Sequence, residues 1–324
     1  MTKLERKIIN SFPIAFILNK SKHWYLPGFE GVPLYDVVRF FYRQVKAVGL
    51  TERASAIAYN FIMAIPPSFL FLFTLIPNLP FIKKREIFKQ LSLLIKDIIP
   101  AEGYNKTIIT FIDITFFKTP VFGLLSFGLL LALFFASNAM MGLMRSFNKN
   151  YHGFQRRAGL HDRWIAIRLT VLIFGLVLGC LVILITQGAA LKFFGLKSAF
   201  WLALILYLRW LVIIALVFYS IAFIYKYAPA VQKRWRLVSP GTILATVLCI
   251  IASLGFSSFV NNYGRYNALY GSIGTIIVLM ALIFINSLVL LIGFELNVSI
   301  KTLKSRAERR DALEKEQLAE QNNT

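Results

Sequence analysis

The chain has 324 residues, of which 57% are hydrophobic and 16% are charged. A typical soluble domain carries about 25% charged residues, so this composition excludes an ordinary water-soluble fold. The mean hydropathy is +0.66 even though it averages over polar tails. The composition indicates an all-α, polytopic membrane protein, because helices satisfy their own backbone hydrogen bonds inside a bilayer.

The charged residues are strongly unbalanced: 36 Lys and Arg face 15 Asp and Glu, which gives a net charge of +21. In a soluble protein this excess indicates nucleic-acid binding. In a multi-pass membrane protein, Lys and Arg instead gather in the cytoplasmic loops. The position of the basic residues relative to the apolar segments therefore decides between the two explanations.

Residues 1–53 form a mostly polar N-terminal segment. No short apolar core lies near its start, so we expect no cleavable signal peptide. Between residues 34 and 48, apolar side chains recur at helical spacing and charged or amide side chains occupy the other side. This pattern predicts an interfacial helix on the inner leaflet. Its apolar face comprises Leu34, Val37, Val38, Phe41, Val45 and Val48.

Six apolar segments between residues 54 and 300 are long enough to cross a membrane, since a bilayer core needs about 20 helical residues. Five of them are free of charge and one is interrupted only by Arg209. We therefore predict a transmembrane domain of six helices. The segments are 54–82, 119–144, 169–191, 198–225, 237–264 and 266–294.

Two polar regions complete the predicted domain organisation. The segment 83–118 contains an amphipathic helix at 87–98 that Pro100 ends. It is either a structural cap over the bundle or a lid that contacts lipid or substrate. The tail at 301–324 is rich in Glu, Arg and Gln, which predicts a charged cytoplasmic helix that is solvated or partly disordered.

The basic residues divide unequally between the two sides of such a bundle. The side that carries both termini holds 25 of them and the opposite side holds ten, while Arg209 lies within a span. The excess of Lys and Arg marks the cytoplasmic side. We therefore expect both termini in the cytoplasm. Topology thus explains most of the positive charge, and we expect no nucleic-acid partner.

The first span contains Pro66 and Pro67 near its middle, which removes two backbone donors and predicts a kink or break. Broken helices often frame transporter sites, because freed carbonyls face a cavity. A proline kink that only shapes packing is the alternative. Tyr59 and Asn60 are the polar residues best placed to satisfy a break.

The last span carries a stripe of small and amide residues: Thr275, Asn286, Gly293 and Asn297. Such a stripe favours close helix packing or lines a cavity. Glu295 lies on another face near the inner boundary, where it either pairs with a cytoplasmic Arg or Lys or takes part in a substrate path. Arg209 is either an anchor at the outer interface or a buried functional charge. The candidate cavity residues are Tyr59, Asn60, Pro66, Pro67, Arg209, Asn286 and Glu295.

Sequence signatures of enzymes are missing. The chain contains no Walker loop, no GxSxG and no HExxH motif, and its three histidines are not clustered with carboxylates. Cys180 and Cys249 lie inside apolar runs, without the spacing of metal ligands. We therefore predict no catalytic residue, no metal site and no cofactor, and expect that the purified protein does not cleave RNA.

The order of several segments is similar to that of a known family, the YihY / virulence-factor BrkB family of bacterial inner-membrane proteins, formerly labelled ribonuclease BN. The resemblance covers about residues 51–298. It is carried by ERASAIAYNFIMAIPP, DIIPAEG, SNAMMGLMRSFNKNYH, YKYAPAVQKRWRLVSPGTILATVLCIIASLGFSSFV and YNALYGSIGTIIVLMALIFINSLVLLIGFELN. The last two segments are the most specific.

The resemblance implies six helices in the bacterial inner membrane with both termini inside, but no settled activity. Pro66-Pro67 and Asn60 depart from the family pattern, which usually has a single proline in the first span. The family pattern falls on Tyr59, Pro100, Asn148, Tyr225, Pro229, Pro240, Gly241, Tyr270, Gly271, Gly293 and Glu295.

Three classes of function remain open at this point. A transporter, translocase or exporter of lipids or small amphiphilic solutes is favoured by the prolines of the first span and the polar stripe of the last. A membrane scaffold or envelope-assembly partner is the alternative, favoured by the absence of a charge relay within the predicted spans. A membrane-tethered nuclease ranks last. Membrane lipids and a small amphiphilic substrate are the expected partners, and the sequence predicts no oligomeric state.

Overall fold

The computed structural model describes residues 20–47, 49–75, 121–148, 159–193, 199–231, 234–263 and 272–322, with six further residues between 88 and 114. The predicted loop at 83–118 therefore lies almost wholly outside the described residues. Within the described part, the chain folds into long helices. They are α3 (Leu34–Ala47), α4 (Leu50–Leu75), α7 (Val121–Phe147), α8 (Gly159–Phe193), α9 (Ala199–Tyr227), α10 (Pro240–Tyr263) and α12 (Ser272–Asn322).

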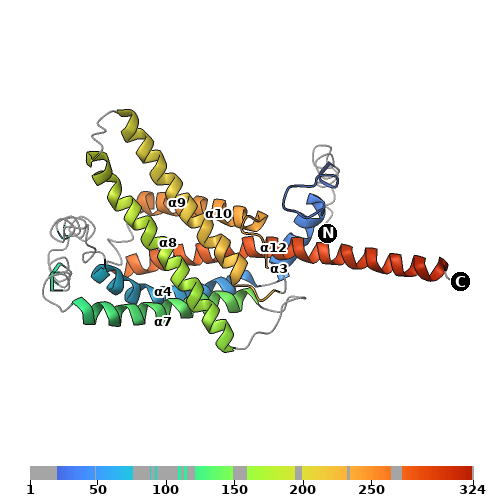
Figure 1. The fold of residues 1–324 in the computed structure, drawn as a ribbon, viewed down its shortest axis with the longest axis horizontal. Coiled ribbons are helices and arrows are strands. Elements are labelled where there is room, and N and C mark those ends of the chain that lie inside the picture. Colours follow the sequence, from blue (N-terminus) through green and yellow to red (C-terminus); the bar gives the residue numbers. More distant parts are fainter. Residues whose placement is uncertain are drawn as a thin grey trace.

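Six of these helices are long and apolar enough to cross a membrane: α4, α7, α8, α9, α10 and α12. The all-α fold with six spans is therefore confirmed. Helix α9 begins at Ala199, ten residues before Arg209, so Arg209 does not mark the start of this helix. Helix α12 continues through the charged tail to Asn322 and projects from the bundle in Figure 1.

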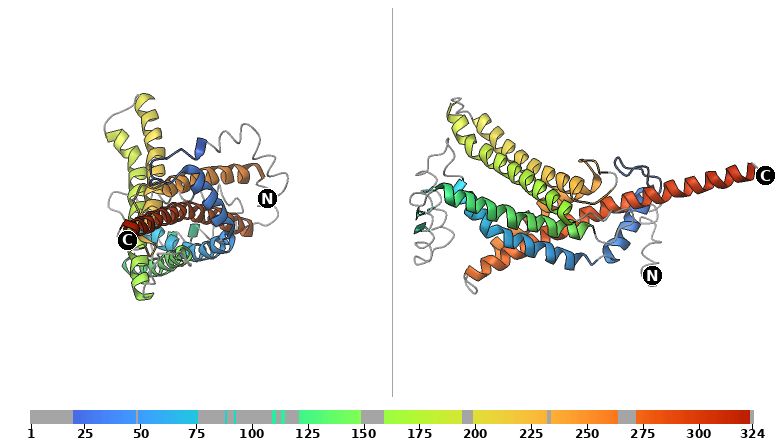
Figure 2. Two further views of the ribbon diagram at one scale, coloured as in Figure 1. Left: turned by 90° about the vertical axis from the view of Figure 1, so that its right-hand side faces the viewer. Right: turned by 60° about the horizontal axis from the view of Figure 1, so that its bottom comes forward.

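The helices pack in a defined order around α12. Helix α4 lies along α7, and α12 contacts α4, α10 and α3. Helices α8 and α9 form a pair, with α8 against α7 and α9 against α10. Figure 2 shows that the α8–α9 pair diverges from α4 and α7 toward the end opposite the C-terminus.

The predicted amphipathic segment is helical over Leu34–Ala47, and part of its apolar face packs against protein. Val37 is fully buried in a small cluster with Phe29, Val32 and Ile300 of α12. Val38, predicted on the same face, is 53% exposed. Residues 29–37 are therefore docked on α12 at the end of the bundle from which the C-terminal tail projects.

The bundle is tightly packed at this same end, which we call the closed end. It contains the start of α4, the end of α7, the end of α9, the start of α10 and residues 287–300 of α12. Side chains that are at most 1% exposed include Ile57, Leu143, Phe147, Tyr225 and Phe294. The main hydrophobic core is thus concentrated in one half of the bundle.

The opposite half, which we call the loose end, lacks this packing in three helices. Among the described side chains, none is buried within residues 207–220 of α9, 251–259 of α10 or 277–286 of α12. Helices α4 and α7 remain packed on each other there. Phe71 of α4 is buried, and a Cβ at Gly128 of α7 would lie 3.5 Å from the Cα atom of Phe71. The asymmetry therefore arises from α9, α10 and α12.

We predicted a kink or break at Pro66 and Pro67. The break is wrong, because α4 runs through both prolines as one helix. The prolines remove the donors for the carbonyls of Ile62 and Met63, but the helix is held on both sides of them by packing. Ala64 and Phe71 are both buried. Membrane helices tolerate proline where neighbouring elements stabilise the local structure.

Candidate functional site

A buried ion pair joins α4 and α12 at the closed end. The Nη1 atom of Arg53 donates to Oε1 of Glu295 over 2.9 Å, and the two side chains are 4% and 0% exposed. Charged residues within a membrane bundle are costly unless they are paired. Glu295 thus has an arginine partner, but this pair is buried in the bundle and not exposed at a membrane boundary.

The same guanidinium also reaches α7. Nη2 of Arg53 donates to the backbone carbonyl of Ser146, in the last turn of that helix. The last carbonyls of a helix lack an internal donor, and a cation there also compensates the negative end of the helix dipole. Arg53 therefore ties three helices together: its own, α7 and α12.

An aromatic cluster lies beside the ion pair. The rings of Phe147 and Phe294 are stacked, with centroids 4.1 Å apart and an interplanar angle of 8°. Tyr225 meets both rings edge-on at 5.9 and 6.3 Å, and Trp235 lies 5.4 Å from Phe294. Each aromatic contact adds about 0.5–1.5 kcal/mol beyond area burial. This cluster fills the closed end with side chains from α7, α9, α12 and the segment before α10.

Two glycines let α10 and α12 approach closely beneath this cluster. A Cβ at Gly293 would lie 2.6 Å from the carbonyl oxygen of Gly241 and 2.6 Å from the hydroxyl oxygen of Tyr225. That hydroxyl donates to the carbonyl of Leu290 over 2.6 Å. Real Cβ atoms do not approach other atoms this closely, so both positions require glycine.

Asn297 forms hydrogen bonds with the start of α10 and with the residue that precedes it. Its Oδ1 accepts from the backbone N–H of Gly241 over 2.9 Å, and its Nδ2 donates to Oγ of Ser239 over 2.9 Å. Ser239 also accepts from the N–H of Thr242 over 3.2 Å and therefore caps the helix. In this part of the polar stripe, Gly293 and Asn297 serve helix packing.

The other candidate residues lie at separate places. Asn60 donates to the carbonyl of Ala56 over 2.7 Å and packs on α7, where a Cβ at Gly142 would lie 2.7 Å from its Nδ2. Asn286 donates to the carbonyl of Leu282 over 3.0 Å and lies 3.5 Å from Oγ of Ser253. Tyr59 is 60% exposed.

The remaining candidate residues are Pro66, Pro67 and Arg209. Pro66 is exposed and Pro67 is half-buried. The side chain of Arg209 lies outside the described ones. Among the described residues, no hydrogen bond links Tyr59, Asn60 and Asn286 to one another. The structure therefore brings Glu295 into a polar contact between helices, and Asn286 into a weak one with Ser253.

Arg53 is the residue that our sequence analysis missed. It is the last residue of the N-terminal segment 1–53, immediately before the first charge-free run, and we counted it only among the basic residues of the cytoplasmic side. Its helical phase was informative, because Ile57 and Ala64 lie one and three turns later on the same face and both are buried. An arginine on the core face of a span predicts a buried acidic partner, and Glu295 is the acid of the last span.

The site consists of groups that hold helices together at one end of the bundle. Across the described residues, no three His, Cys, Asp or Glu side chains are grouped so that they could hold a metal ion. The polar groups that converge are a guanidinium, a carboxylate and a helix carbonyl. Their arrangement fits a contact that holds helices together at one end.

Six helices that are long and apolar enough to span a membrane define a multi-pass membrane protein. Residues 41–319 match the family model described as virulence factor BrkB. Since this match covers most of the chain, the protein belongs to the virulence factor BrkB family. The resemblance found in the sequence is therefore confirmed.

Curated relatives span nearly the same region. The ribonuclease-like protein YfkH of Bacillus subtilis (strain 168) is 29% identical over 260 residues, which cover 78% of this chain and 90% of YfkH. A UPF0761 membrane protein of Tolumonas auensis is 26% identical over 289 residues, covering 83% of this chain and 89% of that protein. No solved structure matches the chain significantly.

Proposed function

We propose that this protein transports lipids or small amphiphilic solutes across the bacterial inner membrane, with both termini in the cytoplasm. In this proposal the closed end faces the cytoplasm and the loose end faces the opposite side. The bundle is then a transport pathway closed at its inner end. The protein is not an enzyme in this proposal, and the ribonuclease-like name belongs to YfkH.

The observation that carries the proposal is a change of environment along single helix faces. On α10, the buried face that includes Cys249 continues one turn later as exposed Ser253. On α12, the face of fully buried Leu291 leads to Met280, which is 46% exposed. A face that is interior at one end and exposed at the other supports an opening between the helices.

Helix α9 follows the same pattern. Tyr225 and Ile221 are buried, and the same face continues to Ile214, Leu211 and Tyr207, which are 44%, 61% and 76% exposed. These side chains are apolar or amphipathic. Such a surface suits acyl chains or amphiphiles better than ions or sugars, because binding them requires no desolvated charge.

The charge distribution supports the orientation. Residues 29–37 dock on α12 at the closed end, and that end also carries Arg234, Arg236, Lys301 and Lys304. Lys and Arg near the ends of spans favour the cytoplasmic side. Release of a substrate into the cytoplasmic leaflet, or uptake from it, would then require the Arg53 and Glu295 contact to open.

A reconstitution experiment tests the proposal. Purified protein is placed in vesicles that contain phosphatidylglycerol or phosphatidylethanolamine labelled with nitrobenzoxadiazole on an acyl chain, and dithionite is added outside. Transport predicts bleaching of fluorophores from the inner leaflet, beyond the outer-leaflet fraction lost in protein-free vesicles. Leu130→Ile changes a side chain that is 67% exposed, and this control variant should transport lipid as the wild type does.

A scaffold function is the second candidate, and the projecting part of α12 favours it. Leu313 and Leu318 are 58% and 59% exposed on this helix, which extends beyond the bundle in Figure 1. If folded protein leaves the inner-leaflet fluorescence of all labelled lipids unchanged, the transport proposal fails. Loss of function after truncation at residue 305 would then support the scaffold.

A further inference from the structure

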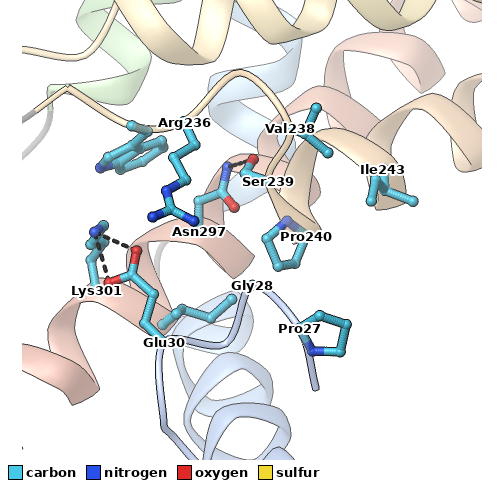
Figure 3. Close-up of a pocket in the computed structure, with 12 residues that line it drawn as sticks. Pro27, Gly28, Glu30, Arg236, Val238, Ser239, Pro240, Ile243, Asn297 and Lys301 are labelled. Carbon is cyan, nitrogen blue, oxygen red and sulfur yellow. Dashed lines mark hydrogen bonds and ion pairs between the residues drawn. The ribbon is translucent and has the colours of Figure 1, made fainter. Parts of the chain in front are cut away.

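A groove opens at the closed end between the segment before α3, the segment before α10 and α12 (Figure 3). Its volume is about 310 Å³, with a polar extension of about 380 Å³ that shares some of its lining. Ligand pockets begin at about 300 Å³, so the groove is large enough for a small ligand or a headgroup.

One side of the groove is cationic. Arg234, Arg236, Lys301 and Lys304 line its polar extension together with Glu30. Glu30 accepts from Lys301 over 2.6 and 2.8 Å and lies 3.1 Å from Lys304. Lys304 also lies 3.8 Å from Glu308. Four cations facing two carboxylates leave an excess of two positive charges.

Arg236, which lines both parts of the groove, is available for a ligand. The side chain of Arg236 is exposed, and Figure 3 draws it close to Asn297 and above Glu30. Among the described residues, the ion pairs of this region involve Lys301 and Lys304 and not Arg236. A guanidinium binds phosphate oxygens in a bidentate manner.

The other side of the groove is apolar and continues along a membrane-spanning helix. Val238 and Ile243 line it and are 63% and 50% exposed. The same face of α10 continues through Val247, Ile251 and Leu254, which are 48%, 58% and 56% exposed. The spacing of four, four and three residues keeps these side chains in one stripe.

We propose that this groove binds an anionic phospholipid, with its phosphate at Arg236 and Lys301 and an acyl chain along the apolar stripe of α10. The phosphate meets the excess positive charge, and the stripe begins where the headgroup is held. Helix α10 begins at Pro240 and is long enough to cross the membrane, which puts the groove at headgroup depth. Basic pockets at this depth bind lipid headgroups.

Glu30 positions the lysines of the site. Its carboxylate engages Lys301 and Lys304, so the lysines are positioned before a lipid arrives. It lies in a turn in which Gly28, Glu30 and Gly31 all have positive φ. Gly28 is required there, because a Cβ would lie 2.9 Å from Pro240.

Native mass spectrometry of the full-length protein in detergent tests the proposal. Wild-type protein should retain one phosphatidylglycerol and bind it more tightly than phosphatidylcholine. Arg236→Gln should weaken phosphatidylglycerol binding about tenfold, because a charge-assisted contact is lost. Arg310→Gln, at an exposed arginine of the projecting helix, is the matched control and should bind as wild type.

Two further measurements separate the lipid from a soluble phosphate and from misfolding. Glycerol 3-phosphate at the lipid concentration should not displace phosphatidylglycerol, and Ile243→Asn should weaken lipid binding with an unchanged lipid-free melting temperature. If glycerol 3-phosphate at the lipid concentration does displace phosphatidylglycerol, the groove binds a soluble phosphate and the proposal is overturned. Equal binding of both lipids, or an Arg236→Gln protein that binds as wild type, would also overturn it.

Discussion

Glu295→Gln is expected to be one of the most destabilising conservative substitutions at the closed end. The change removes the charge that Arg53 faces at 2.9 Å, while the arginine remains 4% exposed. Removing one partner of a buried ion pair costs about 3–5 kcal/mol, because an uncompensated charge stays buried. If the pair lay at an exposed boundary, the cost would be only about 0–1 kcal/mol.

The double variant Arg53→Met, Glu295→Met distinguishes burial of a charge from loss of packing. Replacing both partners of a buried pair by apolar residues is often neutral, although the hydrogen bond to the Ser146 carbonyl is lost at about 1 kcal/mol. We therefore expect the double variant within about 1 kcal/mol of wild type. Unfolding by sodium dodecyl sulfate from mild detergent micelles, followed by tryptophan fluorescence, measures both free energies.

Glu308→Gln is the control, because this carboxylate is 67% exposed and lies 3.8 Å from Lys304. It should change the free energy of unfolding by less than about 1 kcal/mol. A Glu295→Gln protein as stable as this control would refute the buried pair. So would a double variant whose loss equals the sum of the two single losses, because the residues would then be energetically independent.

Three further predictions follow from other contacts. Gly293→Ala should destabilise the bundle by about 1–3 kcal/mol through overpacking. Gly255→Ala, whose Cβ would meet nothing within 4 Å, should stabilise it by up to about 1 kcal/mol. Unfolding in micelles compares the two variants, and equal effects would contradict the close approach of α10 and α12 at Gly293. Burial raises the pKa of Glu30, but hydrogen bonds from Lys301 and Lys304 lower it by more, to below the ordinary 4.5. Its contribution to docking residues 29–37 is therefore complete above pH 4.5 and is lost as the pH falls through the lowered pKa. The protection of this segment from hydrogen exchange, relative to the intrinsic rate at each pH, should fall there in wild type and should not depend on pH in this way in Glu30→Gln. Asn286→Leu should reduce lipid translocation in vesicles while the melting temperature is unchanged, and a variant that transports as wild type would remove Asn286 from the pathway.

The number of spans followed from the sequence because it depends on local composition. A charge-free run of more than 20 residues must cross the bilayer as a helix, whatever its neighbours are. Gly241, Gly293 and Glu295 were also singled out from the sequence. Their partners were not, because each contact joins residues far apart in the chain, such as Arg53 and Glu295, which are 242 positions apart in the sequence.

Two sequence predictions show where local reasoning stops. Consecutive prolines predicted a break in the first span, but tertiary packing of Ala64 and Phe71 keeps the helix continuous. The loose end of α9, α10 and α12 had no sequence signature, because an apolar residue that faces a neighbouring helix and one that faces an opening have the same composition. The groove depends on Glu30 meeting Lys301 across 271 residues, which no periodicity reveals.

Accessibility of single cysteines in intact cells tests the asymmetric opening most directly. In a background where Cys180 and Cys249 are alanine, cysteine is introduced separately at Ser253, Ile251 and Ser146, and a membrane-impermeant maleimide is added outside. The opening predicts labelling of Ser253→Cys at the loose end, but not of Ile251→Cys on the lipid-facing stripe or Ser146→Cys at the closed end. If Ser253→Cys stays as unreactive as Ile251→Cys, or Ser146→Cys is labelled from outside, the bundle is not closed at its inner end and open at its outer end.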